Sequence, residues 1–273
     1  MLDTILNLLQ YKFVLSAILV GTLVSLCSSL LGVTLVLKRF SMIGDGLSHV
    51  AFGALAVATA LGVAPLKISV PVVIAAAFLL LRISESSKIG GDSAVAMISS
   101  TSLAIGVIVI SLSSGMNTDI TSYMFGSLNA LEDSDVILSS ALSVVVIMLY
   151  LLCFSRIFSI TFDESFARAI GIKTGLFNLL IAMITAITIV VGMRVVGAML
   201  ISALIIFPPL TSMRIFKSFR SVAISSAIVA VVCSFVGIMA SCLLNGLPTG
   251  ASIVAVNAVA FCLFSALGLI IKR

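Results

Sequence analysis

The chain has 273 residues, of which 61% are hydrophobic and 9% are charged, and its mean hydropathy is +1.36. Soluble domains carry about 25% charged residues, so this composition excludes a soluble protein and indicates a polytopic membrane protein. The 15 Lys and Arg residues against 10 Asp and Glu give a net charge of +5. In a membrane protein such an excess orients the loops, and it does not indicate a nucleic-acid partner.

We expect one transmembrane domain over residues 1–273, an all-α helical bundle of about eight or nine spans, because no long polar stretch interrupts the chain. The nine apolar segments are 13–37, 46–63, 68–81, 94–114, 136–155, 176–192, 195–213, 221–242 and 251–271. A full span needs about 20 residues. The segments 46–63, 68–81 and 176–192 are therefore predicted to be short or broken, with non-helical backbone from Lys38 to Asp45.

Basic residues fall in alternate connections, which the positive-inside rule places in the cytoplasm. Twelve of the 15 do so: Lys38, Arg39, Arg82, Lys88, Arg156, Arg168, Lys173, Arg214, Lys217, Arg220, Lys272 and Arg273. The connection from Gly115 to Asp135 has no Lys or Arg but carries Asp119, Glu132, Asp133 and Asp135. The pattern predicts an external N-terminus, an external acidic loop and a cytoplasmic C-terminus. Arg194 falls on the external side and either snorkels to the surface or lines a polar path.

The single histidine, His49, stands four residues after Asp45 in the stretch Gly44-Asp45-Gly46-Leu47-Ser48-His49. In a helix, side chains at this spacing point to the same side. A carboxylate and an imidazole together suit zinc, manganese or iron, and ionisable residues in a span are functional candidates by default. The pair predicts a metal site or a proton path. The alternative is that Asp45 caps the helix while His49 packs against a neighbouring helix.

The longest cytoplasmic connection, Thr161 to Gly175, predicts a short amphipathic helix. Thr161 and Glu164 fit a capping box with Thr161 as N-cap, and Gly171 suits the C-terminal stop. Apolar residues recur at helical spacing at Phe162, Phe166, Ala169 and Ile170. Such a helix either lies on lipid or docks a soluble partner through apolar anchors.

Several catalytic signatures do not occur in the sequence. The chain has no GxxxxGK[ST] phosphate loop and therefore no usual route to ATP hydrolysis of its own. It contains no GxSxG, HExxH or GxGD motif, so a membrane hydrolase has no support. The five cysteines are scattered without a CxxC motif, which favours packing roles. We expect a protein that is not an enzyme and has no resident cofactor.

The stretch from Lys38 to His49 resembles the signature of the integral-membrane subunits of bacterial metal-ion ABC importers, in which a basic pair precedes a Gly-Asp-x-Leu-Ser-His core. Four further segments, in the expected order, are similar to the same family: Ser122 to Gly126, Phe162 to Gly171, Val196 to Pro208, and Leu247 to Ala251. There are two departures. Pro208-Pro209 stands where the family often has Pro-Ala, and Arg194 stands where a neutral polar residue is frequent.

The resemblance implies roles for individual residues. Asp45 and His49 correspond to the residues implicated in handling the metal. The cytoplasmic loop corresponds to the one that contacts the ATPase subunit, with docking residues Phe162, Asp163, Glu164, Phe166, Arg168 and Gly171. The implied fold is similar to that of the cobalamin and siderophore importer permeases.

The resemblance also implies the cellular setting. The chain is expected to be a multi-pass permease subunit of the cytoplasmic membrane, surrounded by lipid. Its implied partners are a cytoplasmic ABC ATPase dimer, an extracytoplasmic metal-binding protein, and a second permease copy that is identical or paralogous. The transported ion is expected to be Zn²⁺, Mn²⁺ or Fe²⁺, since Asp and His donors suit all three. Acid should weaken transport because protons compete with the metal for these donors.

Other readings of the same residues remain open at this point. An ATP-independent secondary cation transporter or channel would use Asp45 and His49 as a proton or ion relay, and nucleotide dependence separates it from the importer. A purely structural membrane subunit predicts that Asp45 tolerates Asn. A membrane-embedded enzyme lacks a second convergent catalytic group.

Overall fold

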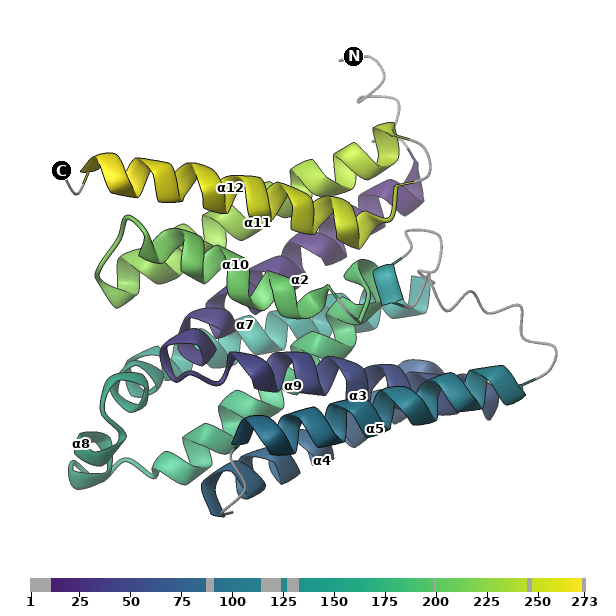
Figure 1. Cartoon of the computed structure of the whole chain (residues 1–273), viewed down its shortest axis with the longest axis horizontal. Helices are drawn as coiled ribbons and strands as arrows, with labels where there is room; N and C mark the ends of the chain where they lie inside the picture. The colour runs from purple at the N-terminus through teal and green to yellow at the C-terminus, as the bar shows by residue number, and fades with distance from the viewer. Residues whose placement is uncertain are drawn as a thin grey trace.

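The computed structural model describes residues 11–86, 91–113, 124–126, 133–198, 200–244 and 247–271. Regular structure in these ranges is helical (Figure 1). The helices are α2 (Lys12–Leu37), α3 (Ser41–Ala60), α4 (Pro65–Ser86), α5 (Gly91–Leu112), α7 (Asp133–Phe162), α8 (Glu164–Ala169), α9 (Thr174–Val196), α10 (Ile201–Met213), α11 (Phe219–Leu243) and α12 (Thr249–Ile271). An apolar chain takes this form in a membrane because a helix satisfies its backbone hydrogen bonds within one segment.

The predicted helical bundle is confirmed. Eight of the nine predicted apolar segments each coincide with a helix in the described part of the chain, and the segment 195–213 corresponds largely to α10. Long helices that follow one another run antiparallel (Figure 1). Among the residues that the structure describes, seven helices are long and apolar enough to cross a membrane, and two shorter apolar helices, Leu66–Leu80 and Ile201–Met213, accompany them. The short helix α8 lies beside the ends of the long ones (Figure 1).

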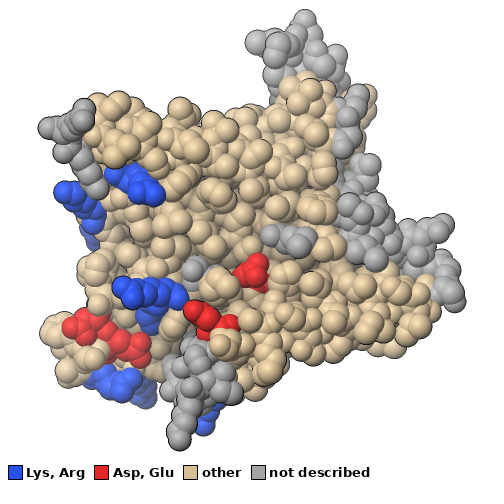
Figure 2. Space-filling model, viewed as in Figure 1, with Lys and Arg blue, Asp and Glu red and all other residues tan. Residues whose placement is uncertain are grey.

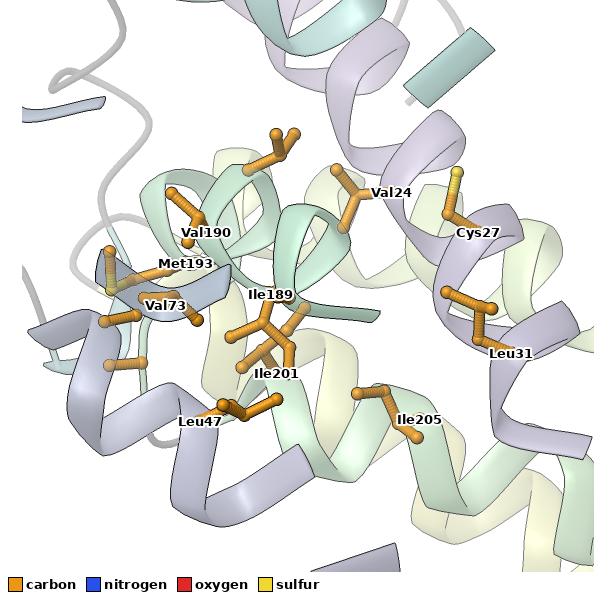
Figure 3. Close-up of a cluster of buried hydrophobic side chains, with 14 of the residues drawn as sticks. Val24, Cys27, Leu31, Leu47, Val73, Ile189, Val190, Met193, Ile201 and Ile205 are labelled. Carbon is orange, nitrogen blue, oxygen red and sulfur yellow. The ribbon is translucent and has the colours of Figure 1, made fainter. Parts of the chain in front are cut away.

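The core of the bundle is built around α2, which packs against α11, α10, α7 and α9. In Figure 3 side chains of α2, α3, α9 and α10 converge, among them Leu31, Leu47, Ile189 and Ile201. Gly32 permits a close approach of α2 to α10, because a Cβ atom there would lie 1.9 Å from the Ile205 carbonyl oxygen. Pro209 has no N–H to donate to that carbonyl, so α2 covers a backbone group that α10 leaves without its helical donor.

Charged side chains mark the two ends of the bundle. Lys and Arg gather at the end that carries α8 and the α10–α11 turn (Figure 2), which the positive-inside rule places in the cytoplasm. Arg156 and Arg214 lie over the rings of Phe177 and Phe261, with 5.5 Å and 4.9 Å between the cation and the ring centroid. At the opposite end, Lys12 of α2 pairs with Asp133 of α7 at 2.5 Å. The structure thus brings most of the basic connections to one end of the bundle, and the orientation of the chain in the membrane stays a prediction.

The prediction that three spans are short is wrong for two of them. Helices α3 and α9, which contain the apolar segments 46–63 and 176–192, have 20 and 23 residues. At 1.5 Å per residue these lengths are roughly 30–35 Å, enough for a full span. Helix α4, which contains the segment 68–81, has 22 residues, but its apolar part, Leu66–Leu80, is short as predicted. Hydropathy underestimated α3 and α9 because polar residues at their ends, such as Ser41 and Thr174, continue the helix.

The non-helical stretch predicted from Lys38 to Asp45 is also wrong for most of its length. The chain leaves the helix only from Lys38 to Phe40, and α3 begins at Ser41. Arg39 makes this tight turn possible with a φ of 60°, a conformation that costs a non-glycine residue energy. Asp45 is therefore part of a regular helix.

The break in regular helix lies elsewhere, between α9 and α10. The segment 195–213 was predicted to be one span, but α9 ends at Val196 and α10, of 13 residues, begins at Ile201. Gly197 adopts a φ of 93°, and a Cβ atom there would lie 2.4 Å from the Met124 carbonyl oxygen. A glycine is required at this corner both by the backbone conformation and by the approach of residues 124–126.

Candidate functional site

Asp45 and His49 lie in the second and third turns of α3, close to its N-terminal end. At 1.5 Å per residue they stand about 6 Å and 12 Å along the helix from Ser41. The interpretation of Asp45 as a helix cap is wrong, because α3 begins four residues earlier, after Phe40. The Asp45 carboxylate therefore does not cap the N-terminus of α3.

The structure brings the two side chains together as the spacing predicted. His49 Nε2 lies 3.8 Å from Asp45 Oδ2, and the side chains are 13% and 42% exposed. This distance is too long for a hydrogen bond. Zinc stands about 2.0–2.2 Å from nitrogen and carboxylate oxygen donors, so both donors can reach one ion lying between them. The open carboxylate gives an ion access, while the more buried imidazole is the fixed member of the pair.

Two donors do not complete a metal site. In the described part of the chain no group of three or more His, Cys, Asp and Glu side chains could hold an ion. His49 Nδ1 is buried and has no hydrogen-bond partner there. In closed metal sites this nitrogen usually donates to a carboxylate or carbonyl, so packing rather than a hydrogen bond orients His49. A structural zinc centre, with four protein ligands, is not formed by these residues alone.

The remaining residues of the stretch explain how α3 presents the pair. Leu47 is fully buried and points into the core beside Ile189 and Ile201 (Figure 3), so residues 45 and 49 face away from it. Gly46 lies against α5, where a Cβ atom would come within 2.6 Å of Val95 Cγ1. Ser48 is buried and donates to the Asp45 carbonyl oxygen at 2.7 Å. Small residues around the two donors therefore hold α3 tightly against its neighbours.

The predicted cytoplasmic helix is present as α8, but its N-cap is not Thr161. Helix α7 continues to Phe162, and Thr161 donates to the Ile157 carbonyl oxygen within it. Asp163 is the N-cap, with extended backbone and a side chain that accepts from Phe166 N at 2.8 Å. The capping-box pattern was misplaced by two residues because α7 extends well beyond the apolar segment 136–155.

The predicted stop at Gly171 is confirmed. Gly171 has a φ of 86°, its N–H donates to the Arg168 carbonyl oxygen, and Ile172 N–H donates to that of Ala167. These two bonds form a Schellman motif. A regular stop of this kind gives a six-residue helix a defined end.

Helix α8 exposes the apolar side chains that the periodicity picked out. Phe166 is 59% exposed and Ile170 is 55% exposed, while Ala167 is buried against Ile160 and Phe177. Phe162 is 60% exposed and its ring lies 5.0 Å from that of Phe158. The apolar contact of α8 with α7 and α9 is thus made by one small residue, Ala167, while its larger apolar side chains turn outward.

The charged residues of this segment make local contacts. Arg168 lies 3.5 Å from Glu164 across one turn of α8. Glu164 also contacts Lys38 and Asn178, two residues that were not among the predicted site residues. A signal for Lys38 existed in the basic pair that precedes the Gly-Asp stretch. A single Asn in the apolar segment 176–192 carried no comparable signal.

Part of the predicted site lies outside the described residues. This applies to Asp119, Glu132, Ser122 and Tyr123, and to the side chain of Arg194. Of the predicted acidic loop, Asp133 and Asp135 are described and belong to the first turn of α7.

Comparisons with known proteins agree on one family. The protein-family model that is described as the ABC 3 transport family matches residues 10–268 of this chain. A probable metal transport system membrane protein of Thermotoga maritima is 33% identical over 255 residues, covering 93% of this chain and 90% of that protein. The high-affinity zinc uptake system membrane protein ZnuB of Buchnera aphidicola is 31% identical over 246 residues, covering 90% of this chain and 94% of that one.

Among solved structures, PsaBC from Streptococcus pneumoniae in complex with Fab contains a chain with the same fold. It superposes with a TM-score of 0.88 at 24% sequence identity and covers 100% of both chains. The identity is low while the whole chain superposes, so this likeness concerns the fold.

Proposed function

Because this chain belongs to the ABC 3 transport family, we propose that it is the permease subunit of an ATP-driven importer that carries a divalent transition metal across the cytoplasmic membrane. The observation that carries the proposal is the pair on α3, where Asp45 Oδ2 and His49 Nε2 lie 3.8 Å apart. Two relatives that match nine tenths or more of this chain are named as membrane proteins of a metal transport system and of a zinc uptake system. The proposed cargo is Zn²⁺, Mn²⁺ or Fe²⁺, and zinc is the first ion to test.

The donors suit a site that an ion passes through. A transported ion must bind well enough to enter and weakly enough to leave. Asp45 and His49 supply one oxygen and one nitrogen donor, and a second permease copy or water would supply the rest. An extracytoplasmic metal-binding protein would release the ion at the end of the bundle that carries Lys12 and Asp133.

Energy for transport must come from a partner, since the sequence has no phosphate loop. Helix α8 is the proposed contact for a cytoplasmic ATPase dimer. Its exposed Phe166 and Ile170 are apolar anchors of the kind that enter a groove on another protein. Phe162, Asp163, Glu164, Arg168 and Gly171 support this contact, partly by holding α8 in shape.

The proposal is tested by uptake of ⁶⁵Zn and ⁵⁴Mn into proteoliposomes that contain the permease with its ATPase and capture protein. Wild-type protein should accumulate one of the ions only when ATP is present. The His49→Ala variant should lose uptake while it still binds the ATPase. Uptake that persists without ATP would indicate a secondary transporter, and normal uptake by His49→Ala would refute the assignment of the pair.

Uptake should also fall in acid. A ligating imidazole must be neutral and a ligating carboxylate ionised, so protons compete with the metal for His49 and Asp45. The uptake rate at subsaturating metal should decrease as the external and internal solutions are acidified together. Nucleotide hydrolysis without added metal, measured on the same preparation, is the control for acid damage to the ATPase.

A further inference from the structure

Three polar side chains connect α8 to the turn from which α3 begins. Lys38 Nζ donates to Asn178 Oδ1 at 2.6 Å and lies 3.4 Å from Glu164 Oε2. Asn178 Nδ2 donates to Glu164 Oε1 at 3.2 Å. Each residue of this triangle contacts the other two. The three come from the C-terminal end of α2, the first turn of α8 and the second turn of α9.

The triangle is shielded from water on the side of the bundle. The Lys38 side chain is 8% exposed and Asn178 is 6% exposed, whereas the Glu164 side chain is 37% exposed. A buried ammonium group is costly unless it is paired and hydrogen-bonded. Glu164 and Asn178 therefore both help to stabilise the buried ammonium group of Lys38. Glu164, the outermost member, is the one that a protein docked on α8 can reach.

Glu164 has a second cation within reach. Arg168 lies 3.5 Å from Glu164 Oε1 and 3.4 Å from Thr174 Oγ1, and its side chain is 73% exposed. The carboxylate thus stands between a buried lysine and an exposed arginine on the face of α8. A partner that binds Arg168 or moves α8 changes the distances from the Glu164 carboxylate to Lys38 and to Arg168.

The turn next to Lys38 transmits its position to α3. Only Arg39 and Phe40 separate Lys38 from Ser41, the first residue of α3, and Arg39 is held at a φ of 60°. Because only two residues lie between them, a displacement of Lys38 also displaces the first residue of α3. Asp45 follows one turn of helix later.

A small cavity adjoins the triangle. A cavity of 20 Å³ is lined by Lys38, Phe40, Ile43 and Asn178, together with Leu35, Ile181, Ala182 and Thr185. That volume is about the size of one water molecule. Ile43 belongs to the first turn of α3, so the cavity lies between the triangle and the start of the helix that carries the metal donors.

We propose that Lys38, Glu164 and Asn178 form a coupling latch that transmits movement of α8, when the ATPase acts on it, to the start of α3 and so to Asp45 and His49. The latch rests on the proposed function and assigns Lys38 and Asn178 as positioning residues for transport. Breaking it leaves the ATPase bound and active while the metal donors no longer follow its cycle.

The test measures metal uptake and phosphate release together in proteoliposomes of the complete transporter, using the ion that the wild type carries. Lys38→Met and Glu164→Gln should each reduce the number of ions taken up per ATP hydrolysed by roughly fivefold or more, the lower end of typical coupling between sites. In Lys38→Met, whose side chain is buried and lies outside the proposed docking contact, the affinity of the permease for the ATPase should stay within about twofold of wild type. Lys173→Gln is the matched control, because it removes an exposed cation from the same cytoplasmic connection and should leave the ratio unchanged.

A variant that leaves one buried charge unpaired can fail to fold. If a single variant does not fold, the double variant Lys38→Met/Glu164→Gln, which removes both charges, is measured in its place. It should show the same loss of coupling as the single variants and no additional loss, since all three break one latch.

Three results would overturn the latch. They are an unchanged ratio of ions to ATP, a loss of ATPase affinity that accounts for all of the lost uptake, and additive losses in the double variant. Failure of the proposed function is distinguishable, because wild-type proteoliposomes would then show no ATP-dependent uptake of any of the three ions.

Discussion

The start of α3 and the short helix α8 are built on opposite principles. Helix α3 is packed by α4, α5, α9 and α10, and small residues around Asp45 and His49 bring neighbouring helices close. Helix α8 is held by an N-cap, a Schellman stop and the buried Ala167, and it exposes its larger apolar side chains. Donors for an ion need fixed positions, whereas a surface for a partner needs a locally stable shape and exposed anchors.

Glycine illustrates the same difference. Gly46 in α3 is required by packing, since a Cβ atom would meet Val95 at 2.6 Å, and its backbone is ordinary helix. Gly171 after α8 has open space around it and is required by its φ of 86°. Substitutions should therefore act through packing in the first region and through local backbone conformation in the second.

The largest expected effect concerns the charge of Asp45. Asp45→Asn keeps the size of the side chain but removes the ionised donor, so uptake should fall by about 100-fold or more, since even supporting residues of metal sites cost 10–100-fold. Ion uptake and ATPase binding are measured on the same proteoliposomes. The control is Asp92→Asn, an exposed carboxylate in the first turn of α5. Full uptake by Asp45→Asn would indicate a purely structural role for Asp45.

The next effect separates docking from ion handling. Phe166→Ala should weaken binding of the ATPase by about 2 kcal/mol, the value typical of a hot-spot aromatic residue, while metal binding to the permease stays unchanged. Affinity is measured by titrating ATPase onto the purified permease. Phe78→Ala, which removes a phenylalanine of similar exposure from α4, should have no effect. Equal losses for both variants would remove the case for α8 as the docking surface.

A smaller effect tests the packing of α3. Gly53→Ala places a Cβ atom 2.6 Å from the Ser102 carbonyl oxygen of α5, so a helix must shift at a cost of about 1–3 kcal/mol. The transition temperature in detergent should fall. Gly175→Ala in α9 meets no atom within 4 Å and should leave that temperature unchanged or slightly raised. An unchanged temperature for Gly53→Ala would show that α3 and α5 are loosely packed.

The smallest effect distinguishes the observed cap of α8 from the one that the sequence pattern suggested. Asp163→Ala should destabilise α8 by about 1 kcal/mol through loss of the bond to Phe166 N. Hydrogen exchange of the α8 amides measures this directly. Thr161→Ala should change exchange much less, because Thr161 lies inside α7. A larger change in exchange for Thr161→Ala than for Asp163→Ala would instead support Thr161 as the N-cap of α8.

Predictions from the sequence succeeded where a feature depends on neighbouring residues. The convergence of Asp45 and His49 follows from four-residue spacing on a helix, and the stop at Gly171 follows from the conformational freedom of glycine. They failed where a feature depends on which segments pack together. The lengths of α3, α4 and α9 exceed their apolar segments because packing keeps polar ends helical.

The sequence by itself determined that the chain is a bundle of membrane helices and where a carboxylate and an imidazole share one helix face, while the orientation that its charge distribution favours stays a prediction. Hydropathy, charge distribution and spacing are local properties, so they are readable from the order of residues. Only the tertiary structure decided the break after Gly197 and the latch. Lys38 meets Glu164 and Asn178 across 126 and 140 residues of sequence. Such partners are chosen by the packing of α2, α8 and α9, which no local pattern contains.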